Sequence, residues 1–185
     1  GIGHDLLMPA ASIVDPELMM SLPPSVTRAC GIDVLFHAME AYIAKCANAF
    51  TDMVSLEALR LVMKYLGRAI EKGGEDREAR EGMAWASPLG GIAIGEGNSG
   101  TVAIHALGQS ANGLVDAPHG LTLCPVAVPY LEKTWDADIP RHAALTRVFG
   151  YGEAGMSDKE LAALCPKAMK GVLQQFGCDI TLKDL

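Results

Sequence analysis

Asp33 and His37 are the first residues in the chain whose types and spacing could do chemistry. They stand four positions apart in a stretch whose apolar residues recur every three or four positions. A helix would therefore carry both side chains on one face, one turn apart. A carboxylate and an imidazole placed in this way can share one metal ion. Taken alone, the pair fits equally well a capping aspartate and a hydrogen-bonded core histidine.

Two more histidines occur in segments that would hold them firmly. His105 lies within the apolar sequence TVAIHALGQ, where a charged imidazole is costly but a neutral, metal-bound one is acceptable. His119 lies in the sequence APHG, at the expected start of a helix. Each histidine taken alone is more often structural than a metal ligand.

Considered together, these four side chains give one oxygen and three nitrogen donors, a set that suits ferrous iron or zinc. The sequence therefore predicts one divalent-metal site with the ligands Asp33, His37, His105 and His119. The chain has five histidines. We predict that the remaining two, His4 and His142, lie on the surface, in a loop and at a polar helix start.

The segments that must position these residues have the pattern of helices. Apolar residues at spacings of three and four predict helices over residues 24–46, 51–72, 76–95, 100–112, 118–132, 138–149 and 157–176. Ser157 and Glu160 have the spacing of a capping box. One short strand-like run, residues 11–14, has no evident partner strand. The predicted fold class is therefore all-α, with a short extended N-terminal segment.

Composition excludes several classes of partner. The 185 residues carry a formal net charge of −7 without a run of Lys or Arg, so we expect no nucleic acid and no membrane surface as partner. No apolar run reaches the roughly 18–20 residues that span a bilayer, and no signal peptide is recognisable. Five cysteines without CxxC spacing indicate reduced thiols and a cytoplasmic protein.

Two stretches resemble the signatures of the iron-containing (group III) alcohol dehydrogenases. GIDVLFHAMEAY is similar to the helix in which an aspartate and a histidine four residues later bind the metal. GNSGTVAIHALGQSANGLVDAPHG is similar to the second signature, which supplies two histidines fourteen residues apart. The order and spacing of these pieces are far more specific than any one piece. The likeness extends from about Gly1 to at least Phe149.

The resemblance implies a helical bundle domain of the dehydroquinate synthase-like type and an NAD(P)-linked oxidoreductase. Such an enzyme interconverts a small alcohol with an aldehyde or ketone, uses Fe²⁺, or alternatively Zn²⁺, to polarise the substrate oxygen, and commonly forms homo-oligomers. Residues 1–23 would be an interdomain segment. Residues 24–185 would be the helical metal-binding domain, incomplete at its C-terminus. Because the family's N-terminal dinucleotide-binding domain is absent from the sequence, we expect this chain alone to bind metal with little or no dehydrogenase activity.

The sequence departs from the family at one position in the site. Many members carry a histidine four residues after the third ligand, and here that residue is Gln109. Glutamine can hydrogen-bond a substrate oxygen but cannot titrate, so Gln109 is the candidate catalytic residue without a proton-relay role. The backbone from Gly97 to Gly100 is expected to line the same pocket. A phosphate cradle is not expected there, because no strand precedes the glycines.

Three alternatives remain open from the sequence. A glycerol-dehydrogenase-like zinc enzyme of the same superfamily has a similar helical domain. A metal-dependent hydrolase would use the same ligands to activate water, and Glu40, three residues after His37, is then the general base to test. A non-catalytic helical module would contain these histidines as structural residues only.

Overall fold

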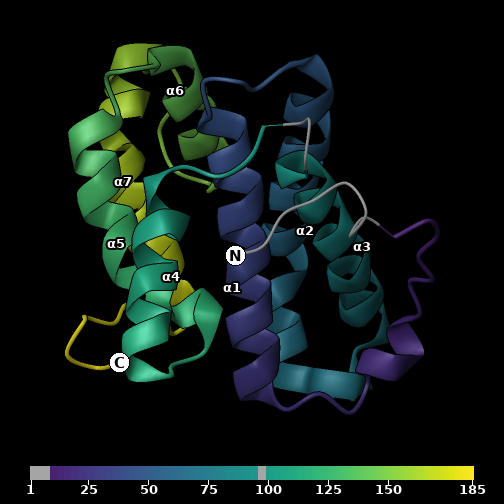
Figure 1. Cartoon of the computed structure of the whole chain (residues 1–185). Coiled ribbons are helices and arrows are strands. Elements are labelled where there is room, and N and C mark those ends of the chain that lie inside the picture. Colours follow the sequence, from purple (N-terminus) through teal and green to yellow (C-terminus); the bar gives the residue numbers. More distant parts are fainter. Residues whose placement is uncertain (1–8, 96–98) are drawn as a thin grey trace.

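The structure is a computed structural model that describes residues 9–95 and 99–185, and its regular structure is helical (Figure 1). No strand occurs within those two ranges. The α-helices are α1 (Pro24–Ile43), α2 (Ala49–Lys72), α3 (Arg77–Ile94), α4 (Ala103–Val115), α5 (His119–Thr134), α6 (Ile139–Val148) and α7 (Asp158–Gln175). Two 3-10 helices accompany them, Pro16–Met19 and Gly73–Glu75. The all-α prediction is confirmed.

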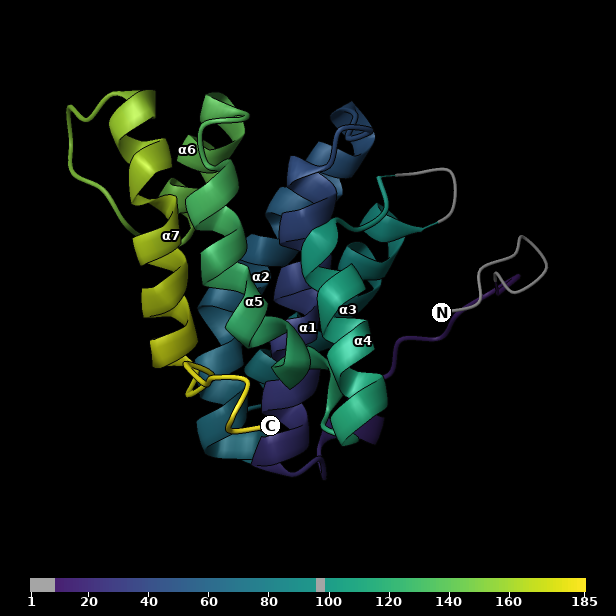
Figure 2. The same cartoon turned by 60° about the vertical axis from the view of Figure 1, so that its left-hand side comes forward.

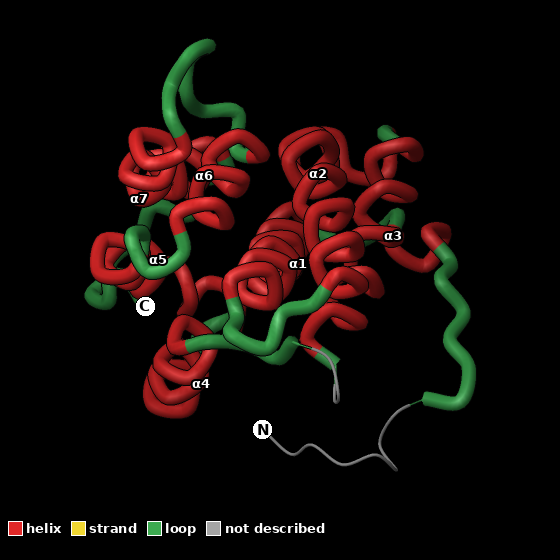
Figure 3. The backbone as a smooth tube through the Cα atoms, turned by 90° about the horizontal axis from the view of Figure 1, so that it is seen from above, coloured by secondary structure: helices red, strands yellow, loops and turns green. Residues whose placement is uncertain are grey.

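Helix α1 lies at the centre of the bundle. It packs on α2 and α3 on one side and on α5 on the other, as the view from above shows (Figure 3). Ile32, Leu35, Phe36 and Met39 have no exposed surface, and a helix that is apolar around most of its circumference belongs in the core. The site residues of α1 are therefore held by the most deeply packed element of the fold.

Helices α5, α6 and α7 form the other half of the bundle, and α4 lies against α5 (Figure 2). Gly108 of α4 allows this close contact, because a Cβ atom there would lie 2.3 Å from Cδ2 of Leu123. Helix α4 begins at Ala103, three residues later than the pattern predicts. The backbone of Gly100 has a positive φ of 69°, which suits a turn before the helix and not its first residue.

Helix starts follow the local sequence. Asn48 caps α2 by accepting hydrogen bonds from the backbone N–H groups of Phe50 and Thr51. The capping box predicted at Ser157 is present, since the backbone N–H of Ser157 donates to Glu160 Oε2 at 2.8 Å. These side chains satisfy N–H groups that have no partner within the helix.

The strand-like run over residues 11–14 does not form a strand. These residues have no regular structure, and Ile13 is 95% exposed. A strand needs a neighbouring strand to pair its backbone, and the described parts of the chain offer none. The 3-10 helix Pro16–Met19, which begins two residues after this run, contacts α3. Residues 1–8, including His4, lie outside the described residues.

Two further expectations are that the cysteines are reduced thiols and that no segment spans a membrane. All five cysteines are free thiols, and Cys124, Cys165 and Cys178 are buried. None of the helices in the described ranges is both long and apolar enough to cross a membrane.

Candidate metal centre

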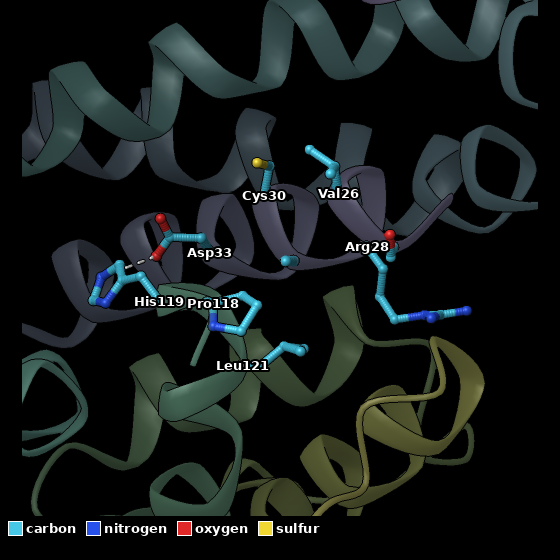
Figure 4. A pocket seen from close by; sticks show the side chains of 10 residues that line it. Val26, Arg28, Cys30, Asp33, Pro118, His119 and Leu121 are labelled. Atoms are coloured by element: carbon cyan, nitrogen blue, oxygen red, sulfur yellow. Dashed lines mark ion pairs between the residues drawn. The ribbon is translucent and has the colours of Figure 1, made fainter. Parts of the chain in front are cut away.

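The four predicted ligands come from three helices. Asp33 and His37 lie one turn apart on α1, and His105 lies in the first turn of α4. His119 is the first residue of α5. Figure 4 shows Asp33 of α1 facing His119 of α5. The structure therefore brings together residues that are up to 86 positions apart (119 − 33).

One carboxylate oxygen lies at the centre of the cluster. Oδ1 of Asp33 lies 3.4 Å from Nε2 of His105, 3.6 Å from Nε2 of His37 and 3.6 Å from Nε2 of His119. The ring centroids of His37 and His105 are 4.7 Å apart in a stacked arrangement. Those of His105 and His119 are 5.3 Å apart with the rings tilted.

The donor atoms fit a divalent cation. Asp33 Oδ1 and His105 Nε2 are buried and have no hydrogen-bond partner, a costly state for polar atoms unless something else occupies the space between them. Ligand atoms of Asp33, His105 and His119 all lie within 4.8 Å of one another. Tetrahedral ligands about 2.1 Å from a metal are about 3.4 Å apart, close to the 3.4–3.6 Å that separate Asp33 Oδ1 from the histidine nitrogens. Asp33, His105 and His119 can thus hold one metal ion, and His37, whose Nε2 lies 3.6 Å from Asp33 Oδ1, is the fourth candidate ligand.

Burial and neighbouring charges shift the pKa values of Asp33, His37 and His105. Burial lowers the pKa of His37 to about 4, so this imidazole is neutral at neutral pH. Burial also lowers the pKa of His105, but the carboxylates of Asp33 and Glu40 outweigh it and raise that pKa to about 9. Burial would raise the pKa of Asp33, yet contact with His105 and the other two histidines holds it below its usual value. The two carboxylates thus favour a positive charge on the His105 side of the cluster.

Glu40 supports the site from behind His105. Its side chain has no exposed surface, and its Oε1 lies 2.6 Å from Nδ1 of His105. The same nitrogen is on the opposite side of the ring from Nε2, which faces Asp33. Glu40 is therefore unsuited to the role of general base considered in the hydrolase alternative.

Glycine allows α5 to start close to α1. A Cβ atom on Gly120 would lie 2.1 Å from the carbonyl oxygen of Ala29 and 3.0 Å from Cβ of Asp33. No side chain fits there, so a glycine directly after His119 lets that histidine reach Asp33. Gly90 likewise lets α3 pack closely on α1 next to His37, because a Cβ atom on Gly90 would lie 3.4 Å from Cβ of His37.

A pocket of about 300 Å³ opens beside the cluster (Figure 4). Asp33 and His119 line it together with mostly apolar groups between α1 and α5, including Val26, Ala29, Cys30, Pro118 and Leu121. Its dimensions and lining suit a small, largely apolar molecule that presents one polar atom to the cluster.

Two further predictions for the site concern Gln109 and the glycine-rich backbone from Gly97 to Gly100. Gln109 is exposed and lies one turn after His105 on α4. Gly97, expected to line the pocket, falls outside the described residues. Gly90 and Gly91 of the glycine-rich stretch lie within α3.

The surface prediction for His142 is wrong. This residue is only 3% exposed, and its Nδ1 lies 2.8 Å from the carbonyl oxygen of Asp138. Its Nε2 is buried without a partner. The spacing of His142 from Leu145 and Phe149, three and seven residues on, is the signal that places it on the buried face of α6.

Comparison with known proteins identifies a matching protein family and similar dehydrogenases. The family model described as Fe-containing alcohol dehydrogenase family, C-terminal, matches residues 27–185. Choline dehydrogenase of Bacillus subtilis (strain 168) is 38% identical over 160 residues, covering 86% of this chain and 39% of that protein. NAD-dependent methanol dehydrogenase of Bacillus methanolicus is 35% identical over 172 residues, covering 92% of this chain and 44% of that protein.

The fold has solved counterparts. The crystal structure of 1,3-propanediol oxidoreductase superposes with a TM-score of 0.85 at 33% identity, covering 92% of this chain and 44% of that one. This chain thus spans less than half the length of the relatives it matches. Because the family model covers nearly all of the helical bundle, the chain belongs to the Fe-containing alcohol dehydrogenase family and corresponds to its C-terminal helical domain.

Proposed function

We propose that this chain provides the metal-binding part of an NAD(P)-linked alcohol dehydrogenase that interconverts a small alcohol with an aldehyde or ketone. Asp33, His37, His105 and His119 would hold one divalent ion, Fe²⁺ or Zn²⁺. The observation that carries the proposal is the convergence of three imidazole nitrogens on one carboxylate oxygen at 3.4–3.6 Å. Family membership supports iron, and the donor set accepts zinc equally well.

The ion would supply Lewis acidity, which lowers the pKa of an alcohol hydroxyl or polarises a carbonyl. The protein residues would do the positioning. Asp33 and the three histidines are fixed by α1, α4 and α5, so the geometry is set before substrate arrives. The apolar walls of the 300 Å³ pocket would take the carbon chain of the substrate.

Gln109 is the candidate for contact with the substrate oxygen. It lies one turn from His105 on α4 and is exposed, so a bound molecule can reach it. Its amide N–H would donate a hydrogen bond to the substrate oxygen, and it would transfer no proton.

The hydride-transfer partner would bind to a different domain. The described residues contain no strand, glycine-rich turn and helix of the kind that holds a dinucleotide. In the full-length enzyme, NAD(P) would bind to the N-terminal domain and meet the substrate at the metal centre. We place the enzyme in the cytoplasm, as a homo-oligomer.

The proposal is tested on the enzyme that contains this chain together with its dinucleotide-binding domain. The protein is loaded anaerobically with Fe²⁺ or with Zn²⁺, and NAD(P)H formation is followed with short primary alcohols. We expect turnover that requires metal and is abolished by Asp33→Asn. Asp136→Asn, which alters an exposed aspartate in the turn after α5, is the control and should leave turnover unchanged. Turnover that survives chelation or Asp33→Asn would contradict the proposal.

A further inference from the structure

Glu40 is a fully buried carboxylate that the proposed chemistry does not use directly. It lies on α1 and has no exposed surface. A buried charge is costly unless several hydrogen bonds compensate it. The partners of Glu40 therefore indicate what it is for.

Both carboxylate oxygens of Glu40 accept hydrogen bonds from α4. Oε2 accepts from the backbone N–H of Val102 at 2.6 Å and from that of His105 at 3.3 Å. Oε1 lies 2.6 Å from Nδ1 of the His105 ring. All three partners lie at the start of α4, 62–65 residues away in the sequence.

The first consequence concerns the helix. Val102 is the N-cap residue of α4, and its side chain makes no capping hydrogen bond. The first N–H groups of a helix need an acceptor from elsewhere, and the negative charge of Glu40 also suits the positive end of the helix dipole. Glu40 thus caps α4 from a neighbouring helix.

The second consequence concerns the histidine. An ionised carboxylate only accepts hydrogen bonds, so the proton on His105 Nδ1 must point at Glu40. The lone pair of the neutral ring is then on Nε2, the nitrogen that faces Asp33 at 3.4 Å. The tautomer that can bind a metal is selected by the hydrogen bond on the other side of the ring.

We propose that Glu40 is a positioning residue for the metal centre, which caps α4 and fixes the His105 tautomer with a single carboxylate. This inference rests on the proposed metal-binding function. It predicts that the carboxylate cannot be replaced by the amide of the same shape. The NH₂ group of a glutamine would face either the N–H groups of α4 or Nδ1 of His105. In the first case the cap is lost, and in the second the ring must carry its proton on Nε2.

The test compares Glu40→Gln with the wild-type protein, and uses Glu57→Gln as the matched control because Glu57 is a half-exposed residue on α2 paired with Arg60. Zn²⁺ affinity is measured by competition with a chromophoric chelator. We expect Glu40→Gln to bind Zn²⁺ about 10–100-fold more weakly and Glu57→Gln to bind as the wild type does. Equal affinity of Glu40→Gln and the wild type would overturn the inference while leaving the metal site itself standing.

Two measurements do not depend on the variant's affinity. In the Zn²⁺-loaded wild type, ¹⁵N NMR of labelled histidine should show His105 protonated at Nδ1 and bound through Nε2. Binding through Nδ1 would overturn the inference. In the metal-free proteins, amide hydrogen exchange at Val102 and His105 should be faster in Glu40→Gln or in Glu40→Ala than in the wild type, and unchanged exchange would overturn the capping role. Failure of the wild type to bind Zn²⁺ would instead overturn the proposed function.

Discussion

Nε2 of His105 and Oδ1 of Asp33 lie 3.4 Å apart, and neither atom has a hydrogen-bond partner although both are buried. The two residues are 72 positions apart in the sequence (105 − 33) and lie on α1 and α4. This short distance is the main evidence for a metal centre, because one cation between the two atoms can bind both of them.

Metal binding should release a proton. Burial lowers the pKa of His105, but the carboxylates around it raise the pKa to about 9, so at pH 7 its metal-free ring is protonated. A metal must displace that proton. His37, with a pKa of about 4, is already neutral and releases none. We expect close to one proton per Zn²⁺ from His105, and an apparent affinity that falls about tenfold per pH unit below pH 9.

Isothermal titration calorimetry in buffers with different ionisation enthalpies measures this number. Binding without any proton release at pH 7 would show that His105 is neutral before the metal arrives, contrary to the electrostatics of the cluster.

Gly120→Ala should destabilise the protein and weaken the site. The added Cβ would lie 2.1 Å from the backbone oxygen of Ala29, so α5 must move away from α1 and carry His119 with it. Overpacking of this kind typically costs about 1–3 kcal/mol. Denaturant unfolding measures the loss. Gly91→Ala on α3 is the control, since nothing lies within 4 Å of its Cβ position, and it should be neutral or slightly stabilising. Equal stability of both variants would contradict the proposed close contact.

Gln109→His should add a titration to catalysis. Glutamine does not titrate, whereas a histidine at an exposed position has a pKa near 6.5. In the full-length, metal-loaded enzyme, the pH profile of kcat/KM for a primary alcohol should gain an inflection at about pH 6–7. Gln109→Ala should lower kcat/KM without adding that inflection. Identical profiles for all three proteins would exclude residue 109 from contact with the substrate.

Ser157→Ala should lower stability through α7. Ser157 accepts from the backbone N–H of Glu160 and closes the capping box. Losing such a cap costs about 0.5–2 kcal/mol. Ser110→Ala on α4 is the matched control, because this exposed serine bonds only to the carbonyl four residues earlier. A thermal melt of both variants checks the difference, and a loss in Ser110→Ala as large as in Ser157→Ala would argue against a specific capping effect.

The helices could be predicted from local sequence because their signals are local. Apolar spacing and caps such as Asn48 and Ser157 act within one or two turns. The relative placement of Asp33 and His105 could be expected only from the order and spacing of the two signatures. Periodicity alone predicts no contact between them.

The rest could not be predicted because it depends on tertiary contacts. Glu40 lies in an apolar helix. No residue near it in the sequence indicates that its carboxylate accepts a hydrogen bond from the backbone N–H of Val102, 62 residues later. The run at residues 11–14 has strand-like composition, but a strand forms only with a partner. The polar residues at the start of α6 favour a surface position for His142, yet only 3% of this residue is exposed in the folded bundle.

The most direct test of the metal centre is stoichiometry. Protein purified without added metal is titrated with Zn²⁺, dialysed, and measured by elemental analysis, alongside Asp33→Asn, His105→Ala, His119→Ala and the control Asp136→Asn, with circular dichroism to verify that each is folded. We expect one tightly held ion per chain in the wild type and in Asp136→Asn, and substoichiometric binding in the three site variants. A folded wild type that retains no ion, or site variants that retain a full equivalent, would contradict the proposed metal centre.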